Sequence, residues 1–117
     1  MRWNCIRLIY PELISGSLEN LIDMIKGYIY ILTNKNFTVL YVGATKNLKI
    51  RVQQHINGTG AVFTKKYNTT VLIYFEEFDD YKEAFIKEKK LKNWHKTWKW
   101  NLAKVSNPEL KDLYLEL

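Results

Sequence analysis

The sequence predicts a small α+β domain in which a three-stranded sheet is flanked by helices. Three observations lead to this prediction. Residues 27–32 and 37–43 have the composition of two strands joined by a turn, residues 71–76 have that of a third strand, and helical patterns follow the second and third strands. The expected order is strand, strand, helix, strand, helix, helix, and the sheet is expected to be antiparallel or mixed.

The first two strands are predicted from β-branched and aromatic residues. Residues 27–32 read GYIYIL and residues 37–43 read FTVLYVG, and both compositions favour strands. The intervening residues 33–36 have turn chemistry, so the pair is expected to form an antiparallel hairpin. Thr45 or Asn47 is the expected cap of a helix that ends near the Asn57-Gly58 pair.

The rest of the chain is predicted to contain one more strand and two more helices. The expected segments are a loop over 57–68, a strand over 71–76, a helix from about 81 to 94, a short helical stretch around 98–105, and a turn after Pro108. Asp79 or Asp80 is the expected cap of the longer helix.

The 117 residues suit one domain, which we expect to span residues 24–117. Residues 1–23 show no sustained period and are expected to be a weakly ordered N-terminal extension; the alternative is a short helix over 18–25 packed on the domain. The chain has a single cysteine, Cys5, and no apolar run long enough to span a bilayer. A cytoplasmic location without membrane contact is therefore expected.

Positive charge is concentrated in the predicted domain. The chain carries a net charge of +6, and residues 24–117 hold 16 basic against nine acidic side chains, a net of +7. An excess of this size attracts polyanions, of which a phosphate backbone is the commonest in a cytosol. The charge therefore predicts a nucleic acid as the partner, either DNA or RNA.

Two groups of residues in the first half could carry chemistry. Tyr28, Tyr30 and Tyr41 lie on the predicted hairpin, although tyrosines are also ordinary strand formers. Arg51 and His55, four residues apart, share one edge of the first predicted helix. Arg51 is the only arginine after residue 7, and a planar guanidinium binds a phosphoryl group in two places; an exposed arginine–histidine pair is the plainer interpretation.

Glu88 is predicted to lie on the inward face of the helix over 81–94. Ala84, Phe85 and Leu91 are the apolar positions around it, and a carboxylate in such a place needs a cation or a metal as partner. Lysines and tryptophans are interleaved along residues 87–100, which suits contacts with phosphates and exposed bases, or a solvated lysine face over an aromatic core.

These residues together resemble the GIY-YIG nuclease family. Tyr28-Ile29-Tyr30 resembles the first half of its motif, with Tyr28 where the family usually has glycine, and Tyr41-Val42-Gly43 resembles the second half. Leu48–His55 resembles the family's helix with its arginine, and Lys87–Lys92 resembles the segment with its metal-binding glutamate. The likeness runs from about Gly27 to Lys104 and is closest to small stand-alone bacterial members, similar to the catalytic domain of the excision-repair nuclease subunit.

The resemblance implies a metal-dependent endonuclease that hydrolyses phosphodiester bonds in DNA, one strand at a time and with little sequence preference. The implied catalytic residues are Tyr30, Tyr41, Arg51, His55 and Glu88, with Glu88 binding Mg²⁺ or Mn²⁺. Tyr30, assisted by Tyr41 and His55, would help deprotonate the attacking water. A second register beginning at Gly27-Tyr28 leaves Tyr28 as the alternative to Tyr30.

The expected contacts with the nucleic-acid backbone are made by Lys65, Lys66, Lys89, Lys92 and Lys96. No recognition domain is expected beside the predicted catalytic one, so we expect the protein to cut with little sequence preference, to read a branched or damaged structure, or to be targeted by a protein partner. The alternative to an enzyme is a non-catalytic nucleic-acid-binding module with a degenerate nuclease fold. That alternative uses the lysines and aromatics but gives no reason for an inward Glu88.

Overall fold

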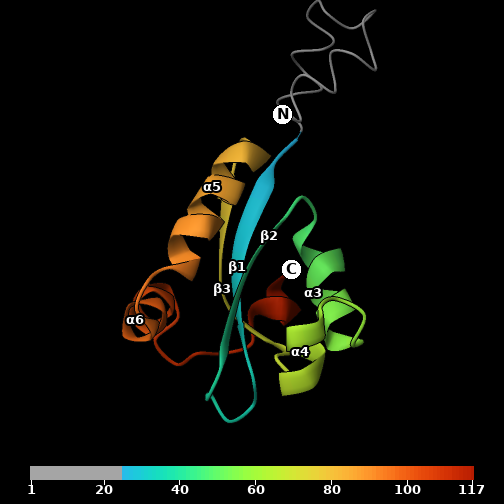
Figure 1. The fold of residues 1–117 in the computed structure, drawn as a ribbon, viewed down its shortest axis with the longest axis vertical. Helices are drawn as coiled ribbons and strands as arrows, with labels where there is room; N and C mark the ends of the chain where they lie inside the picture. Colours follow the sequence, from blue (N-terminus) through green and yellow to red (C-terminus); the bar gives the residue numbers. More distant parts are fainter. Residues whose placement is uncertain (1–24) are drawn as a thin grey trace, which may run out of the picture.

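The computed structural model describes residues 25–117, which form a three-stranded antiparallel sheet with helices on both of its faces (Figure 1). The sheet consists of β1 (Gly27–Thr33), β2 (Leu40–Thr45) and β3 (Val71–Phe78), in the order β2-β1-β3. This confirms the predicted α+β class and the predicted order of strands and helices. The expectations for residues 1–23, and for a helix over 18–25, fall almost wholly outside the described residues.

The central strand β1 divides the interior into two cores. Ile29 and Ile31 pack on one face with side chains of α5 (Tyr81–Lys92) and α6 (Lys96–Ser106). Tyr30 and Leu32 pack on the other face with α3 (Leu48–Ile56) and the 3-10 turn η2 (Leu113–Glu116). Alternate residues of a strand point to opposite faces, so one strand can serve both cores.

The helix α3 follows the hairpin directly and is held by a side-chain cap. Asn47 caps α3 by accepting a hydrogen bond from the backbone N–H of Ile50 at 3.2 Å. Leu48 and Val52 are buried against the sheet, which brings the next inward position, His55, over the hairpin. The register of β1 and β2 pairs Tyr30 with Gly43 beneath this helix.

The predicted loop over residues 57–68 is wrong in part, because it contains the short helix α4 (Val62–Tyr67). Ala61 at its start provides no side-chain cap, and Asn68 ends it in the left-handed conformation at φ 52°. The helix is only six residues long and includes two β-branched residues, so its local sequence does not favour a helix. Contacts with α3 stabilise it instead, and Thr64 is its buried residue.

The later elements agree with prediction apart from their ends. Asp80 caps α5, which ends two residues earlier than expected at Lys92, with Asn93 as its cap. α6 begins two residues earlier than expected because the side chain of His95 accepts from the backbone N–H of Thr97. The expected turn after Pro108 leads into η2, whose residues close the second core. Among residues 25–117 no helix has the length and apolar character that crossing a membrane requires.

Two buried threonines give a stability prediction. The Thr33 hydroxyl donates to the carbonyl oxygen of Val39 at 2.7 Å, whereas the Thr69 hydroxyl is buried without a hydrogen-bond partner. Replacing an unpaired buried hydroxyl with a methyl group removes a desolvation penalty, so we expect Thr69→Val to raise the free energy of unfolding by about 1 kcal/mol. Thr33→Val, which loses a made bond, should lower it by about 1 kcal/mol. Urea unfolding of both variants checks this, and equal changes in the two would contradict it.

Candidate active site

The site is built around Tyr30 at the middle of the hairpin. Tyr30 is 1% exposed and lies opposite Gly43 in the β1–β2 register. A Cβ atom at position 43 would overlap the phenol ring of Tyr30, so the missing side chain is what lets the ring lie across β2. Gly43, the last residue of Tyr41-Val42-Gly43, is therefore needed for the packing of Tyr30 on the neighbouring strand.

A buried chain of hydrogen bonds joins Tyr30 to α3 and α4. The hydroxyl of Tyr30 is 2.8 Å from Nε2 of His55, and Nδ1 of His55 is 2.8 Å from Oγ1 of Thr64. His55 is 1% exposed, so these bonds satisfy both nitrogens of an imidazole that cannot reach solvent. A Cβ at position 60 would overlap the His55 ring, so Gly60 gives the ring its space.

Burial and charge shift the pKa values of both partners in this bond. Burial lowers the pKa of His55 to about 4, with the positive charge of Arg51 adding to the effect. Burial raises the pKa of Tyr30 well above its usual value. Arg51 partly counters this rise, as a hydrogen-bond donor toward the phenol oxygen and through its charge. At neutral pH the pair is therefore a neutral phenol beside a neutral imidazole.

Tyr41 lies between this buried pair and the surface. Its ring centroid is 5.2 Å from that of His55 and 6.3 Å from that of Tyr30, and it stacks on Phe63 at 5.9 Å. The side chain is half-buried, and no residue in the range 25–117 hydrogen-bonds its hydroxyl. This hydroxyl is free to meet a water or a substrate.

Arg51 is the cation of the site. It is partly exposed on α3, and its guanidinium donates to Oε1 of Gln54 at 2.9 Å, which leaves most of its donors unused. Its charge acts on the pKa values of both Tyr30 and His55, so it lies beside the buried pair. The structure thus brings together four of the five residues proposed as catalytic on β1, β2 and α3.

Glu88, the fifth, borders the site from α5. Its side chain is 13% exposed, and Oε1 is 2.8 Å from Nζ of Lys92 one turn later. Its negative charge adds to the rise in the pKa of Tyr30, which places it in the same electrostatic environment. Ala84 and Leu91 on the same helix are buried, as the inward spacing predicted.

Tyr28, the alternative to Tyr30, lies elsewhere. Its hydroxyl donates to Oε1 of Glu77 on β3 at 2.8 Å in an exposed position. This hydrogen bond is the main cause of the raised pKa of Tyr28. Tyr28 therefore pairs with the edge of the sheet opposite to the one that carries Tyr41.

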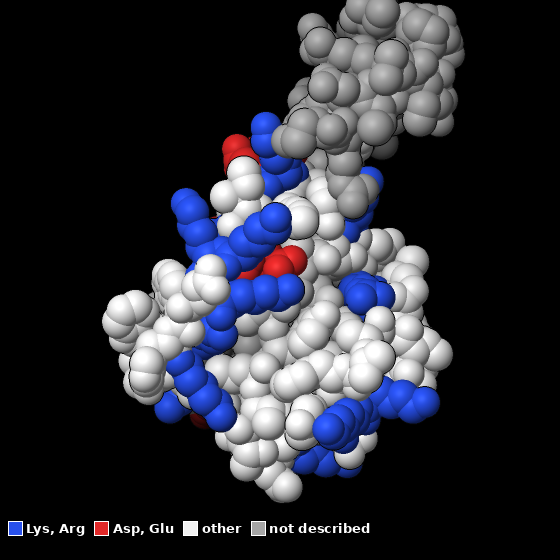
Figure 2. All heavy atoms as spheres, in the orientation of Figure 1, with Lys and Arg blue, Asp and Glu red and all other residues white. Residues whose placement is uncertain are grey.

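The lysines proposed to bind nucleic acid lie in two groups. Lys and Arg atoms gather over α5 and α6 on one side of the molecule and over α4 on the other, with mostly uncharged surface between them (Figure 2). Lys65 and Lys66 are the exposed lysines of α4. In the other group Lys92 pairs with Glu88, Lys96 donates to the carbonyl oxygen of Thr38 at 2.7 Å, and Lys89 lies over the Phe85 ring.

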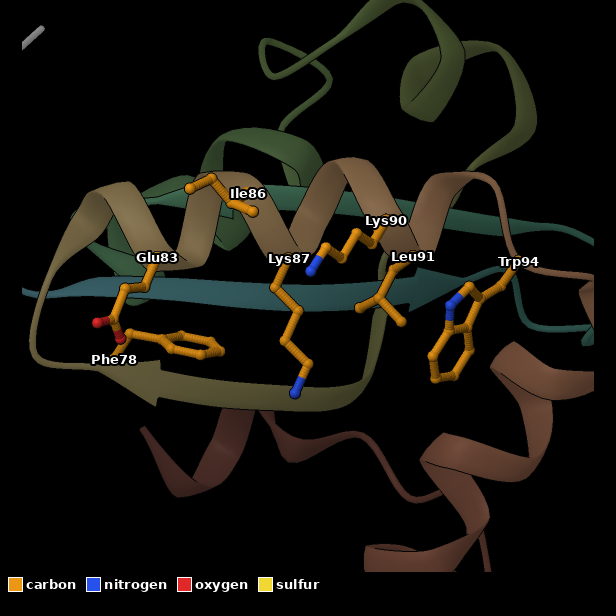
Figure 3. Close-up of a pocket in the computed structure, with 7 residues that line it drawn as sticks. All are labelled: Phe78, Glu83, Ile86, Lys87, Lys90, Leu91 and Trp94. Atoms are coloured by element: carbon orange, nitrogen blue, oxygen red, sulfur yellow. The ribbon is translucent and has the colours of Figure 1, made fainter.

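A pocket of about 300 Å³ lies between α5 and the end of β3 (Figure 3). Phe78, Ile86, Leu91 and Trp94 supply its apolar lining, and charged side chains of α5 complete it. None of the five residues proposed as catalytic lines it. The candidate site is therefore defined by its side chains rather than by this pocket.

A divalent cation fits the site through one carboxylate. Residues 25–117 contain no group of three or more acidic, histidine or cysteine side chains that could enclose an ion. Mg²⁺ is commonly held by one or two carboxylates together with waters and substrate phosphates. Glu88, which has one oxygen on Lys92 and is largely shielded, fits such a ligand.

Sequence reasoning missed Gly60 and Thr64. Gly60 lies in the predicted loop with Gly58. Two glycines so close in sequence could have indicated that another group approaches the backbone closely there. Thr64 gave no signal, because its role depends on His55 nine residues earlier and on a helix that the sequence did not predict.

The pKa of His55 gives a prediction about pH. The folded pKa of about 4 lies below the value of ~6.5 for an unfolded chain, so the unfolded state binds an extra proton between these pH values. Stability should fall by roughly 2–3 kcal/mol as pH drops from about 6.5 to 4. NMR titration of the His55 ring and urea unfolding between pH 4 and 8 check this.

Substitution of His95 is the matched control for this prediction about pH. His55→Gln should remove this part of the pH dependence, whereas the same change at His95, exposed at the start of α6, should leave it in place. A His55 resonance that titrates near pH 6.5 in the folded protein would contradict the burial argument.

The chain is similar in sequence to known proteins. A family model, the GIY-YIG catalytic domain, matches residues 26–101, which run from β1 into α6. The chain is 36% identical over 85 residues to a UPF0213 protein of Clostridium perfringens, covering 73% of this chain and 88% of the relative. It is 34% identical over 92 residues to a UPF0213 protein of Pediococcus pentosaceus, covering 79% and 97%.

A third relative, a UPF0213 protein of Staphylococcus saprophyticus, is 38% identical over 79 residues, covering 68% of this chain and 95% of the relative. No solved structure matches the chain. The family match covers the sheet, α3, α4, α5 and about half of α6, and so includes every residue of the candidate site. It supports a nuclease-type function with a nucleic acid as substrate. On these matches the chain belongs to the GIY-YIG family.

Proposed function

We propose that this protein is a divalent-metal-dependent endonuclease that hydrolyses phosphodiester bonds in DNA, one strand at a time and with little sequence preference. The observation that carries the proposal is the placement of a partly exposed Arg51 beside the buried Tyr30–His55 pair, with Glu88 bordering them. A phosphoryl group, an attacking water and a cation each find a suited side chain in this arrangement.

Arg51 is suited to the scissile phosphate. Most of its guanidinium donors are unused, and such donors stabilise the negative charge that develops on phosphoryl oxygens. A phosphate bound there would also oppose the effect of the Arg51 charge on His55, whose pKa would then rise. The base of the site would thus become stronger when substrate is present.

Tyr30 and Tyr41 have different roles toward the attacking water. Tyr30 is buried and its pKa is raised, so it remains a phenol and acts through His55, whose neutral imidazole can take its proton. Tyr41 is half-buried with an unbonded hydroxyl, so we assign to it the contact that orients the water. Proton transfer from the water toward Tyr30 would accompany transfer of the Tyr30 proton to Nε2 of His55.

Glu88 is the residue that would hold Mg²⁺ or Mn²⁺. When bound, the ion would polarise the scissile phosphate and stabilise the leaving oxygen. In the absence of an ion Lys92 neutralises the Glu88 carboxylate, so a lysine one turn away keeps the half-buried charge paired.

The lysines fit a role in binding without sequence readout. Those of α4 and those of α5 and α6 lie on two sides of the uncharged surface, where they can contact phosphates of one strand or of two (Figure 2). The described residues contain one such catalytic arrangement, so a single binding event would cut one strand.

The first test is nicking of supercoiled plasmid with Mg²⁺, Mn²⁺ or a chelator. We expect metal-dependent nicking that Glu88→Gln and Arg51→Lys each reduce about 100-fold or more, since single groups that stabilise transition-state charge have effects of this size. DNA binding, measured by fluorescence anisotropy, should persist in both variants.

Glu83→Gln is the matched control for Glu88→Gln, because Glu83 lies on the same helix with an exposed side chain. It should nick like the wild-type protein. If Glu88→Gln also nicks like wild type, or if the wild-type protein binds DNA tightly and never cuts it, the non-catalytic binding module is the better explanation.

Salt dependence tests the lysines. Each lysine that neutralises a phosphate contributes about one unit to the slope of log K against log salt concentration, so Lys65→Ala and Lys66→Ala should each reduce that slope by about 1. Lys111, ion-paired with Glu109 at 3.0 Å and outside both lysine groups, is the control. Unchanged slopes for the α4 variants would remove that helix from the DNA interface.

A further inference from the structure

Thr64 ends the buried chain of hydrogen bonds that begins at Tyr30. Its hydroxyl donates to the carbonyl oxygen of Ala61 at 3.0 Å, within the first turn of α4. A hydroxyl has one proton to donate, so toward Nδ1 of His55, at 2.8 Å, the Thr64 oxygen can only accept. The hydrogen between these two atoms must therefore belong to Nδ1.

This assignment determines which atom donates in the other hydrogen bonds of the buried series. A neutral imidazole carries one N–H, so with the hydrogen on Nδ1 the Nε2 atom presents its lone pair. The Tyr30 hydroxyl, 2.8 Å from Nε2, must then donate to it. The lone pairs of the Tyr30 oxygen are left for the Arg51 guanidinium, the donor that counters the rise in the pKa of Tyr30.

We propose that Thr64 is a positioning residue that holds His55 in the Nδ1–H tautomer and thereby directs the Tyr30 proton toward Nε2 of His55. The effect on cleavage rests on the proposed endonuclease function, whereas the tautomer itself does not. With the opposite tautomer, Tyr30 would face two donors, Nε2–H and Arg51, and its own proton would have no acceptor among them.

Burial alone does not explain why the Thr64 hydroxyl is hydrogen-bonded. Thr69 lies five residues later, is equally buried at 0% exposure, and its hydroxyl has no hydrogen-bond partner. The two threonines are also linked, because the backbone N–H of Thr69 donates to the carbonyl oxygen of Thr64 at 3.1 Å. Packing at this end of α4 therefore accepts a β-branched side chain whether or not its hydroxyl is used.

The first arm of the test measures the tautomer in the wild-type protein. ¹⁵N NMR of the histidine ring at pH 7 should show His55 with a protonated Nδ1 and an unprotonated Nε2. In Thr64→Val, which keeps the shape and removes the acceptor, we expect a shift of the His55 signals toward the Nε2–H form. Thr64→Ser should restore the wild-type pattern, and Thr69→Val should leave it unchanged.

The second arm measures plasmid nicking by the same variants. Thr64→Val should lower kcat by about 10- to 100-fold with KM unchanged, the usual size of effect for a group that orients a catalytic one. Thr64→Ser should recover most of the rate, and Thr69→Val should nick like the wild type. A structural role alone would not distinguish serine from valine in this way.

The proposal is overturned if His55 carries its hydrogen on Nε2 in the wild-type protein, or if Thr64→Val leaves the His55 tautomer unchanged. It is also overturned if Thr64→Val and Thr69→Val lose the same amount of activity. Should the wild-type protein fail to cut any substrate, the proposed endonuclease function fails, and the NMR arm alone decides the role of Thr64.

Discussion

The hydrogen bond between Tyr30 and His55 is the constraint on which this domain depends. It joins the central strand to α3 at a place from which water is excluded, and a buried polar group without a partner costs about 1–3 kcal/mol. Each partner therefore requires the other, and each also requires space. Gly43 gives the phenol its place across β2, and Gly60 gives the imidazole its place beneath the turn that leads to α4.

The same bond makes the site electrostatically asymmetric. Its two partners are held neutral by burial, while the partly exposed Arg51 and the largely shielded Glu88, which is paired with Lys92, border them. In the proposed function these charged side chains meet the phosphodiester, and the buried pair behind them accepts the proton. Because the His55 imidazole remains neutral at neutral pH, it can still accept a proton when an anion binds beside Arg51.

Local pattern was enough to predict the sheet, α3, α5 and the inward position of Glu88, because alternation and helical spacing act over a few residues. It could not separate Tyr28 from Tyr30, which share a face of β1. Their difference comes from β3, where Glu77 binds the Tyr28 hydroxyl, and from α3, which covers Tyr30. Helix α4 was missed because contacts with α3 outweigh its poor local preference.

The division of β1 between two cores has a consequence for how the site can vary. Ile29 and Ile31 pack toward α5, while Tyr30 and Leu32 pack toward α3. The position of the β1 backbone therefore affects the packing on both faces of the sheet. Repacking the α5 face, for instance around Leu91, would move the backbone that carries Tyr30, and a close-packed interior transmits such shifts. The hydrogen bond to His55, 2.8 Å long, tolerates little displacement, because hydrogen bonds weaken steeply when their geometry is distorted. The geometry of the site and the stability of the opposite core are therefore coupled through one strand.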